Sequence, residues 1–273
     1  MSFSVIIPAR FGSSRLPGKP LLDICGQPMI QRVWQQACRS NARQVVIATD
    51  DERIRDACRQ FGAEVVMTAT EHQSGTDRLE EVARKLALPE DHSVINVQGD
   101  EPMMPPQLIN QVAGNLERFK EAAAATLCER LDDPSQVGNP NIVKVVFDKD
   151  GYAHYFSRAP IPWFRDGWTE TSGDLSPRTW FRHIGIYGYR AGLLRRFVSW
   201  GPAPLERVES LEQLRILHHS EKLHVDEAVC PLPGGVDTQA DLERVRRQFA
   251  TALEQGNAAP GLETPANGAP DNG

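Results

Sequence analysis

The chain has 273 residues, of which 40% are hydrophobic and 24% charged, and its formal net charge is −6. This length and composition are ordinary for a globular protein of one large domain or two. The negative charge argues against general nucleic-acid binding, which needs a basic face, but it leaves room for a local cationic pocket. No apolar run has the length of a membrane span, and the first residues enter a strand pattern without signal-peptide features. We therefore expect no membrane association.

The number and spacing of the cysteines indicate the cellular compartment. The five cysteines are widely spaced and form no C-x-x-C pair: Cys25, Cys38, Cys58, Cys128 and Cys230. An odd, scattered set is typical of reduced packing residues, not of a disulfide framework or a zinc site. We predict a cytoplasmic protein with reduced cysteines.

Short Val- and Ile-rich runs alternate with helical patterns. Strands are predicted at 4–8, 44–49, 63–67, 93–98, 122–128 and 142–147, and helices at 28–40, 51–61, 76–88, 105–118, 209–219 and 239–254. Asp50 and Asp51 stand at an N-cap position, and Pro105-Pro106 opens the fourth helix. Nearly continuous apolarity at 45–49 and 94–97 is typical of strands covered on both faces. The alternation implies right-handed crossovers, so we predict an α/β fold with a Rossmann-like, mostly parallel sheet flanked by helices.

The pattern changes between about 152 and 190. Two runs, 152–156 and 181–189, alternate like antiparallel strands, and a Pro-, Trp- and Gly-rich connection joins them. Exposed aromatics in such a connection mark a subunit contact, unless Trp163, Trp168 and Trp180 cap the core. We predict a smaller antiparallel insertion within a single domain at 1–254. The tail at 255–273 is rich in Ala, Pro, Gly and Asn, and we expect it to be disordered.

A glycine- and serine-rich loop follows the first strand. It carries three cations, Arg10, Arg15 and Lys19, and its backbone amides together with these charges suit a polyphosphate. A Walker A loop does not fit, because Gly12 and Gly18 enclose five residues and a proline follows Lys19. The dinucleotide fingerprint G-x-G-x-x-G is also absent. The alternative interpretation is an ordinary tight turn with exposed cations.

The stretch Ile-Pro-Ala-Arg-Phe-Gly-Ser-Ser-Arg-Leu-Pro-Gly-Lys-Pro-Leu resembles the signature loop of the sugar nucleotidyltransferases. Within them it is similar to the 3-deoxy-manno-octulosonate cytidylyltransferases. The similarity recurs, in order, at 96–102, 183–187, 211–215 and 235–238, so it spans roughly residues 1–250. The resemblance implies transfer of CMP from CTP to 3-deoxy-D-manno-octulosonate (Kdo), giving CMP-Kdo and diphosphate and activating Kdo for lipopolysaccharide biosynthesis. It also implies a homodimer formed through the antiparallel insertion, which contributes to sugar binding.

Two carboxylates are candidate Mg²⁺ ligands. Gly99 permits a tight turn after strand 93–98, so Asp100 can face the same cleft as Lys19, where carboxylate and phosphate oxygens would share a hard cation. Asp237 is the second ligand by resemblance. The alternatives are a turn or N-cap carboxylate for Asp100 and the cap of the helix near 239 for Asp237. Glu101 is interpreted as a residue at the start of the following helix.

The resemblance also assigns substrate contacts. Arg10, Arg15 and Lys19 would hold the triphosphate, with Lys19, Arg10 and the two aspartates catalytic, and Ser74, Arg78, Ala9 and Arg10 would surround the nucleotide. The 74–78 segment also has the pattern of an N-cap box, in which Thr76 or Asp77 closes the first turn of a helix. The sugar-acid contacts implied are Gln98, Arg158, His183, Tyr187, Glu212 and Gln213. Arg158 can form a fork to a carboxylate, whereas His183, on one strand face with Tyr187, has a structural alternative.

Nucleotidyl transfer needs in-line positioning and charge neutralisation rather than covalent chemistry, so no dedicated general base is required. A Mg²⁺ ion would lower the pKa of the attacking sugar hydroxyl. The rivals are a nucleotidyltransferase for a sialic acid, an isoprenoid polyol phosphate or a hexose phosphate, and a catalytically inactive regulator with the same fold. Arg158 and the 211–215 motif favour a sugar acid, and Lys19, Asp100 and Asp237 argue against the regulator.

Overall fold

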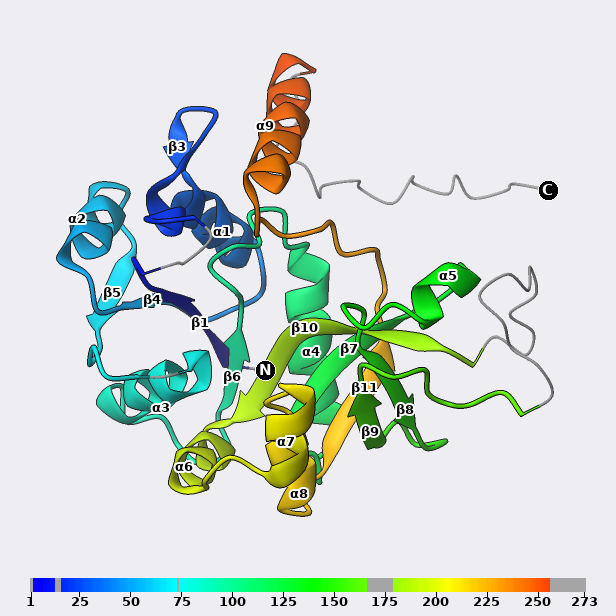
Figure 1. The fold of residues 1–273 in the computed structure, drawn as a ribbon. Coiled ribbons are helices and arrows are strands. Elements are labelled where there is room, and N and C mark those ends of the chain that lie inside the picture. Colours follow the sequence, from blue (N-terminus) through cyan, green and yellow to red (C-terminus); the bar gives the residue numbers. More distant parts are fainter. Residues whose placement is uncertain (1, 13–15, 73, 166–178, 256–273) are drawn as a thin grey trace, which may run out of the picture.

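The computed structural model describes residues 2–12, 16–72, 74–165 and 179–255. Its main sheet has the strand order β11-β7-β10-β6-β1-β4-β5, with β8 and β9 joined to one side (Figure 1). The strands are β1 Phe3–Ala9, β4 Gln44–Thr49, β5 Glu64–Met67, β6 Ser93–Asn96, β7 Ala124–Arg130, β8 Lys144–Phe147, β9 Ala153–Ser157, β10 Phe181–Arg190 and β11 Leu223–Glu227. Strand β1 pairs in parallel with β4 and β6, β4 with β5, and β7 with β11. The prediction of a mostly parallel α/β sheet is confirmed.

Helices cover both faces of the sheet. They are α1 Met29–Cys38, α2 Glu52–Gln60, α3 Gly75–Lys85, α4 Pro106–Arg118, α5 Pro134–Val137, α6 Ala191–Ser199, α7 Pro204–Glu209, α8 Leu214–His218 and α9 Gln239–Glu254. Alternate side chains of β1 pack on opposite faces of the sheet. Val5 and Ile7 belong to the core cluster that includes Ile30 of α1. Ile6 belongs to the cluster that includes Leu79 of α3. This explains the continuous apolarity of the parallel strands.

Local end signals were interpreted correctly at several helices. The Asp51 side chain accepts from the Arg53 amide and caps α2, and Pro106 is the first residue of α4. The predicted helix at 209–219 is only partly confirmed, because α7 begins earlier, at Pro204, and ends at Glu209, before Ser210, whose backbone is left-handed with φ 52°. A separate short helix, α8, follows. Strand β11 and helix α6 were not predicted.

The antiparallel segment is continuous with the main sheet. Strand β8 pairs antiparallel with β9 and with the first residues of β10, and β10 then runs between β6 and β7, antiparallel to both. Trp163 is 68% exposed and Trp180 only 2%, so Trp180 caps a small core as the alternative interpretation held. Trp168 and the tail from 256 lie outside the described residues. The subunit contact through this region stays a prediction.

The C-terminal helix returns to the N-terminal part of the chain. Figure 1 shows α9 beside the hairpin formed by β2 (Asp23–Ile24) and β3 (Gln27–Pro28). Phe249 of α9 packs in one cluster with Ile24, and Arg246 donates to the Asp23 carbonyl at 2.9 Å. This docking brings the segment before α9 to the first loop of the chain.

All five cysteines are free; Cys58 and Cys128 are buried as packing residues, whereas Cys38 is exposed. Within the described ranges, none of the helices combines the length and apolarity needed to span a bilayer.

Candidate active site

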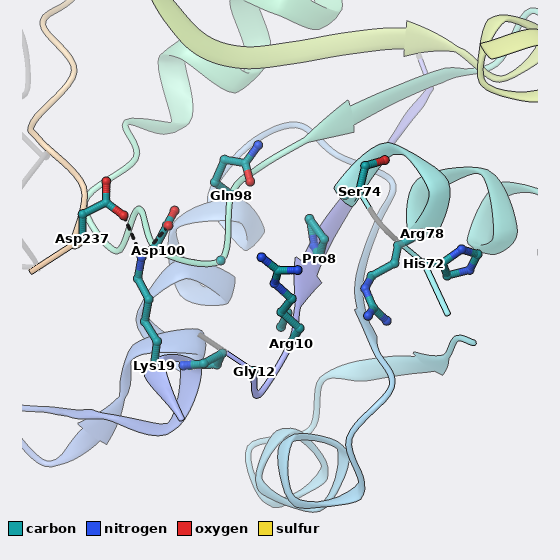
Figure 2. A pocket seen from close by; sticks show the side chains of 14 residues that line it. Pro8, Arg10, Gly12, Lys19, His72, Ser74, Arg78, Gln98, Asp100 and Asp237 are labelled. Atoms are coloured by element: carbon teal, nitrogen blue, oxygen red, sulfur yellow. Dashed lines mark hydrogen bonds and ion pairs between the residues drawn. The ribbon is translucent and has the colours of Figure 1, made fainter. Parts of the chain in front are cut away.

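A cavity of about 310 Å³ lies at the carboxyl ends of β1 and β6 (Figure 2). Eight residues selected from the sequence line it: Ala9, Arg10, Lys19, Ser74, Arg78, Gln98, Asp100 and Asp237. Arg15 lies outside the described residues. Parallel strands deliver their loops to one edge of a sheet, which is why motifs distant in sequence meet here.

Two glycines allow the loops to approach closely. A Cβ on Gly99 would lie 2.7 Å from the carbonyl oxygen of Pro8, so only glycine lets the end of β6 pass the end of β1. Gly18 has φ 66°, its amide donates to the Phe11 carbonyl at 3.1 Å, and Phe11 packs against it. These contacts close the cationic loop and aim Lys19, at the start of the short helix η1 (Lys19–Leu21), into the cavity.

Lys19 lies between the two candidate metal ligands. Its Nζ donates to Asp100 Oδ2 at 2.7 Å and to Asp237 Oδ1 at 3.2 Å, as Figure 2 shows. Thr238 caps α9, so the alternative role of Asp237 as that cap is wrong. Asp100 lies in a turn and is not the N-cap of α4, which is Pro105. Neither aspartate is used as a helix cap, and both line the cavity.

The donor set fits Mg²⁺. Two carboxylate oxygens already converge on one cation, the Lys19 ammonium, and Mg²⁺ binds through one or two carboxylates completed by phosphate oxygens and water. No group of three or more His, Cys, Asp or Glu side chains suited to a metal exists among the described residues. A metal here would thus depend on ligands supplied by a bound nucleotide.

Glu101 is not at the start of a helix, because α4 begins only at Pro106. Its Oε2 is buried without a hydrogen-bond partner among the described residues. Burial raises the pKa of Glu101 to about 8, with further contributions from the charges of Asp100 and Asp237, opposed by Lys19. Burial and the two neighbouring carboxylates thus both disfavour the charged form of Glu101.

The opposite wall of the first cavity is rigid. Ser74 caps α3 by accepting from the Asp77 amide at 3.2 Å, which confirms the N-cap box, and its own amide donates to Asp77. Arg78 is only 3% exposed and donates to Asp50 at 2.6 Å and to Thr68 at 2.5 Å. A guanidinium held by two partners presents a fixed edge to the cavity.

His72 also lines this wall and was missed in the sequence analysis. Its Nε2 lies 2.6 Å from Glu81 Oε2, and the same carboxylate bonds Lys85 Nζ at 2.8 Å and the Ala69 amide at 2.9 Å. Burial would raise the pKa of Glu81, but these hydrogen bonds lower it to about 2. Proximity to the 74–78 motif was the one signal that pointed to His72.

A second cavity, of about 80 Å³, adjoins the first. Its lining includes four of the six residues selected for a sugar acid: Gln98, Tyr187, Glu212 and Gln213. Gln98 lines both cavities, so ligands in the two would meet at this side chain. Burial raises the pKa of Glu212, which accepts from Thr76 Oγ1 at 3.0 Å.

The second cavity also includes residues that sequence reasoning missed. Asn96 is buried, its side-chain oxygen has no partner among the described residues, and it stands two positions before Gln98. That spacing along the predicted strand 93–98 is the signal that could have found it. Tyr189 stacks on Tyr187, with ring centroids 5.6 Å apart.

His183 and Arg158 do not line either cavity. His183 bonds Thr126 Oγ1 at 2.9 Å and stands behind Tyr187, with ring centroids 5.2 Å apart; burial lowers the pKa of His183 to about 3. Its structural alternative is therefore the one the geometry favours. The Arg158 guanidinium donates to the backbone carbonyls of Glu209 and Pro140, and its contact with a sugar-acid carboxylate stays a prediction.

Comparison with known proteins agrees with this geometry. The family model described as cytidylyltransferase matches residues 4–223. A protein of Marinobacter nauticus named 3-deoxy-manno-octulosonate cytidylyltransferase is 62% identical over 263 residues, covering 94% of this chain and 99% of that one. A protein of the same name from Pseudomonas syringae pv. syringae is 58% identical over 247 residues, covering 90% and 97%.

Two solved structures are also similar. The structure of CMP:2-keto-3-deoxy-manno-octonic acid synthetase complexed with CTP has a TM-score of 0.83 and 40% identity, covering 92% of this chain and 99% of that one. A cytidylyltransferase from Leptospira borgpetersenii, with 14% identity, a TM-score of 0.57 and coverage of 96% and 90%, shares the fold. Fold, cavity and matches together define a nucleotidyltransferase. The chain belongs to the cytidylyltransferase family, and the resemblance inferred from its motifs is confirmed.

Proposed function

We propose that this protein transfers CMP from CTP to Kdo, forming CMP-Kdo and diphosphate and so activating Kdo for lipopolysaccharide biosynthesis. The observation that carries the proposal is the position of Gln98, which lines both the cation-rich cavity and the smaller polar cavity. A nucleotide in the first would have its α-phosphate near a sugar hydroxyl in the second. The names of the relatives and the CTP complex of the similar structure support this assignment.

In the first cavity, this chain's residues bind and orient the nucleotide. Arg10, Arg15 and Lys19 would neutralise the triphosphate, with Lys19 donating to phosphate oxygens in place of one of its carboxylate partners. Ser74 and Arg78 would contact the cytosine edge, with Ala9 on the other side. Because Asp50 and Thr68 already hold Arg78, little reorganisation accompanies base recognition.

Asp100 and Asp237 would hold Mg²⁺ once the phosphates complete its coordination. The bound ion would supply charge neutralisation and a lowered pKa of the attacking hydroxyl. In the second cavity, Gln98, Tyr187, Glu212 and Gln213 would orient the sugar acid for in-line attack. We place His183 and Arg158 behind these contacts rather than against the substrate.

We further propose a cytoplasmic homodimer, with the exposed Trp163 near the subunit contact. The test of function is incubation of the purified protein with Mg²⁺, each nucleoside triphosphate in turn, and Kdo or a sialic acid. Diphosphate release and a CMP-sugar product are measured. We expect reaction with CTP and Kdo. Reaction only with a sialic acid, or none with any triphosphate, would refute the proposal.

A further inference from the structure

A buried lysine donates to three backbone carbonyls near the end of β9. Lys144, the first residue of β8, is fully buried, and its Nζ donates to the carbonyl oxygens of Asn139 (3.0 Å), Ile142 (2.7 Å) and Arg158 (2.6 Å). An ammonium group has three protons, so these bonds satisfy it completely. Because a buried cation has lost its hydrating water, its charge depends on these three hydrogen bonds for stabilisation. Lys144 thereby ties the 139–142 loop to the end of β9.

Arg158 continues this network toward α7. Its Nε donates to the Glu209 carbonyl at 2.7 Å and its Nη1 to the Pro140 carbonyl at 3.0 Å, while Nη2 reaches the Ser210 carbonyl at 3.5 Å. One guanidinium therefore bridges the loop that Lys144 holds and the turn between α7 and α8.

Glu209 closes the network from the opposite side. Its carboxylate accepts from Ser157 Oγ at 2.6 Å and from the Arg158 amide at 3.0 Å. Burial would raise the pKa of Glu209, but these hydrogen bonds hold it below its usual value. Glu209 is therefore the negative charge that faces the Lys144 and Arg158 cations. Neither Lys144 nor Glu209 lines either cavity.

The turn held by this network carries the candidate sugar-binding side chains. Ser210 has φ 52°, a left-handed conformation that costs energy for a residue with a Cβ and persists where its surroundings hold it. Glu212 and Gln213 follow and line the second cavity.

We propose that Lys144 and Glu209 are positioning residues that act through Arg158. They hold the Ser210 turn so that Glu212 and Gln213 face the sugar acid. The identity of the ligand rests on the proposed function, whereas the network does not.

The kinetic test compares Glu209→Gln and Lys144→Met with the control Lys149→Met. The Ser157 hydroxyl and the Arg158 amide donate to different oxygens of Glu209, so an amide at 209 replaces one of these acceptors with a donor and removes the negative charge. Lys149 lies on the same hairpin but is exposed and forms an ion pair with its neighbour Asp150. We expect both network variants to raise the KM for Kdo about tenfold or more while the KM for CTP stays near wild type. Equal changes in both KM values, or none, would overturn the proposal.

A second measurement needs no turnover. The amides of Leu211, Leu214 and Ile216 donate within the turn and α8, to Glu206, Leu211 and Gln213 respectively. Hydrogen exchange at 211–216 should be faster in Glu209→Gln than in wild type and unchanged in Lys149→Met. Unchanged exchange in Glu209→Gln would contradict the positioning role, even if Lys144→Met fails to fold. If the wild-type protein does not react with Kdo, the proposed function is refuted. The hydrogen-exchange result then tests the positioning role by itself.

Discussion

Lys19 and Asp100, both in the lining of the first cavity, form an ion pair of 2.7 Å although 81 positions separate them in the sequence. Asp237, 218 positions from Lys19, accepts from the same ammonium. One ammonium and two carboxylates, carried by three different loops, therefore form ion pairs with one another before any substrate is bound. The triphosphate and its cation would rearrange these pairs on binding, which makes each group a sharp target for substitution.

Lys19→Met should remove a cation that faces developing negative charge. We expect a loss of roughly 10²–10³ in kcat, the effect of removing one preorganised donor. Thermal stability should change little, because Asp237 is half exposed and can be solvated. Lys120→Met, which removes an exposed ion pair with Glu117 at the end of α4, is the control. Wild-type turnover by Lys19→Met would show that the loop is only a turn.

Asp100→Asn and Asp237→Asn should each abolish most Mg²⁺-dependent diphosphate release, because each removes a charge from one metal site. The double variant should be no worse than the poorer single variant, since a site fails only once. Asp133→Asn is the matched control, because Asp133 caps α5 by accepting from the Ser135 amide and lines neither cavity. Since Asn caps equally well, this variant should leave stability and activity intact. Multiplicative losses in the double variant would argue against a shared metal.

Base selectivity should depend on the buried partners of Arg78. CTP should be strongly preferred over ATP and GTP, because a site built to bond one base edge leaves polar groups unpaired with another. Asp50→Ala frees the Arg78 guanidinium and should raise the KM for CTP about tenfold while reducing discrimination against UTP. Asp51→Asn is the control, because Asp51 caps α2 and Asn caps equally well. Steady-state kinetics with four triphosphates measure both effects.

Glu81 should make stability depend on pH. Burial would raise the pKa of Glu81, but hydrogen bonds from Lys85, Ala69 and His72 lower it from 4.5 to about 2 in the folded protein. A carboxylate with a lowered folded pKa stabilises the protein above its unfolded pKa, and this contribution disappears as pH falls from about 4.5 through about 2. The contribution is on the order of 3 kcal/mol at neutral pH.

Urea unfolding at pH 7 and pH 3 measures this effect. Glu81→Gln should reduce the difference between the unfolding free energies at pH 7 and pH 3. Glu80→Gln should retain that difference, because the Glu80 carboxylate lies 3.6 Å from the exposed Arg84. An unchanged pH dependence in Glu81→Gln would disprove the assignment.

Local features of this protein could be predicted from the sequence by itself. The Asp51 cap, the Pro106 helix start and the bounds of α9 follow from propensities and side-chain-to-backbone bonds that span a few residues. The residues of the phosphate loop could also be selected from the sequence, because its glycines and cations lie within one short segment.

Long-range contacts required the tertiary structure. Nothing in the periodicity places β10 between β6 and β7, and nothing near Asp237 predicts that α9 docks on β2 and delivers that carboxylate to Lys19. The carbonyl partners of Arg158 and the burial of Glu101 are likewise set by chain segments remote in sequence. Hydrogen-bond partners and desolvation depend on what surrounds a group in space, so residue type and spacing determined the candidates, and packing decided which of them face the substrate cavities.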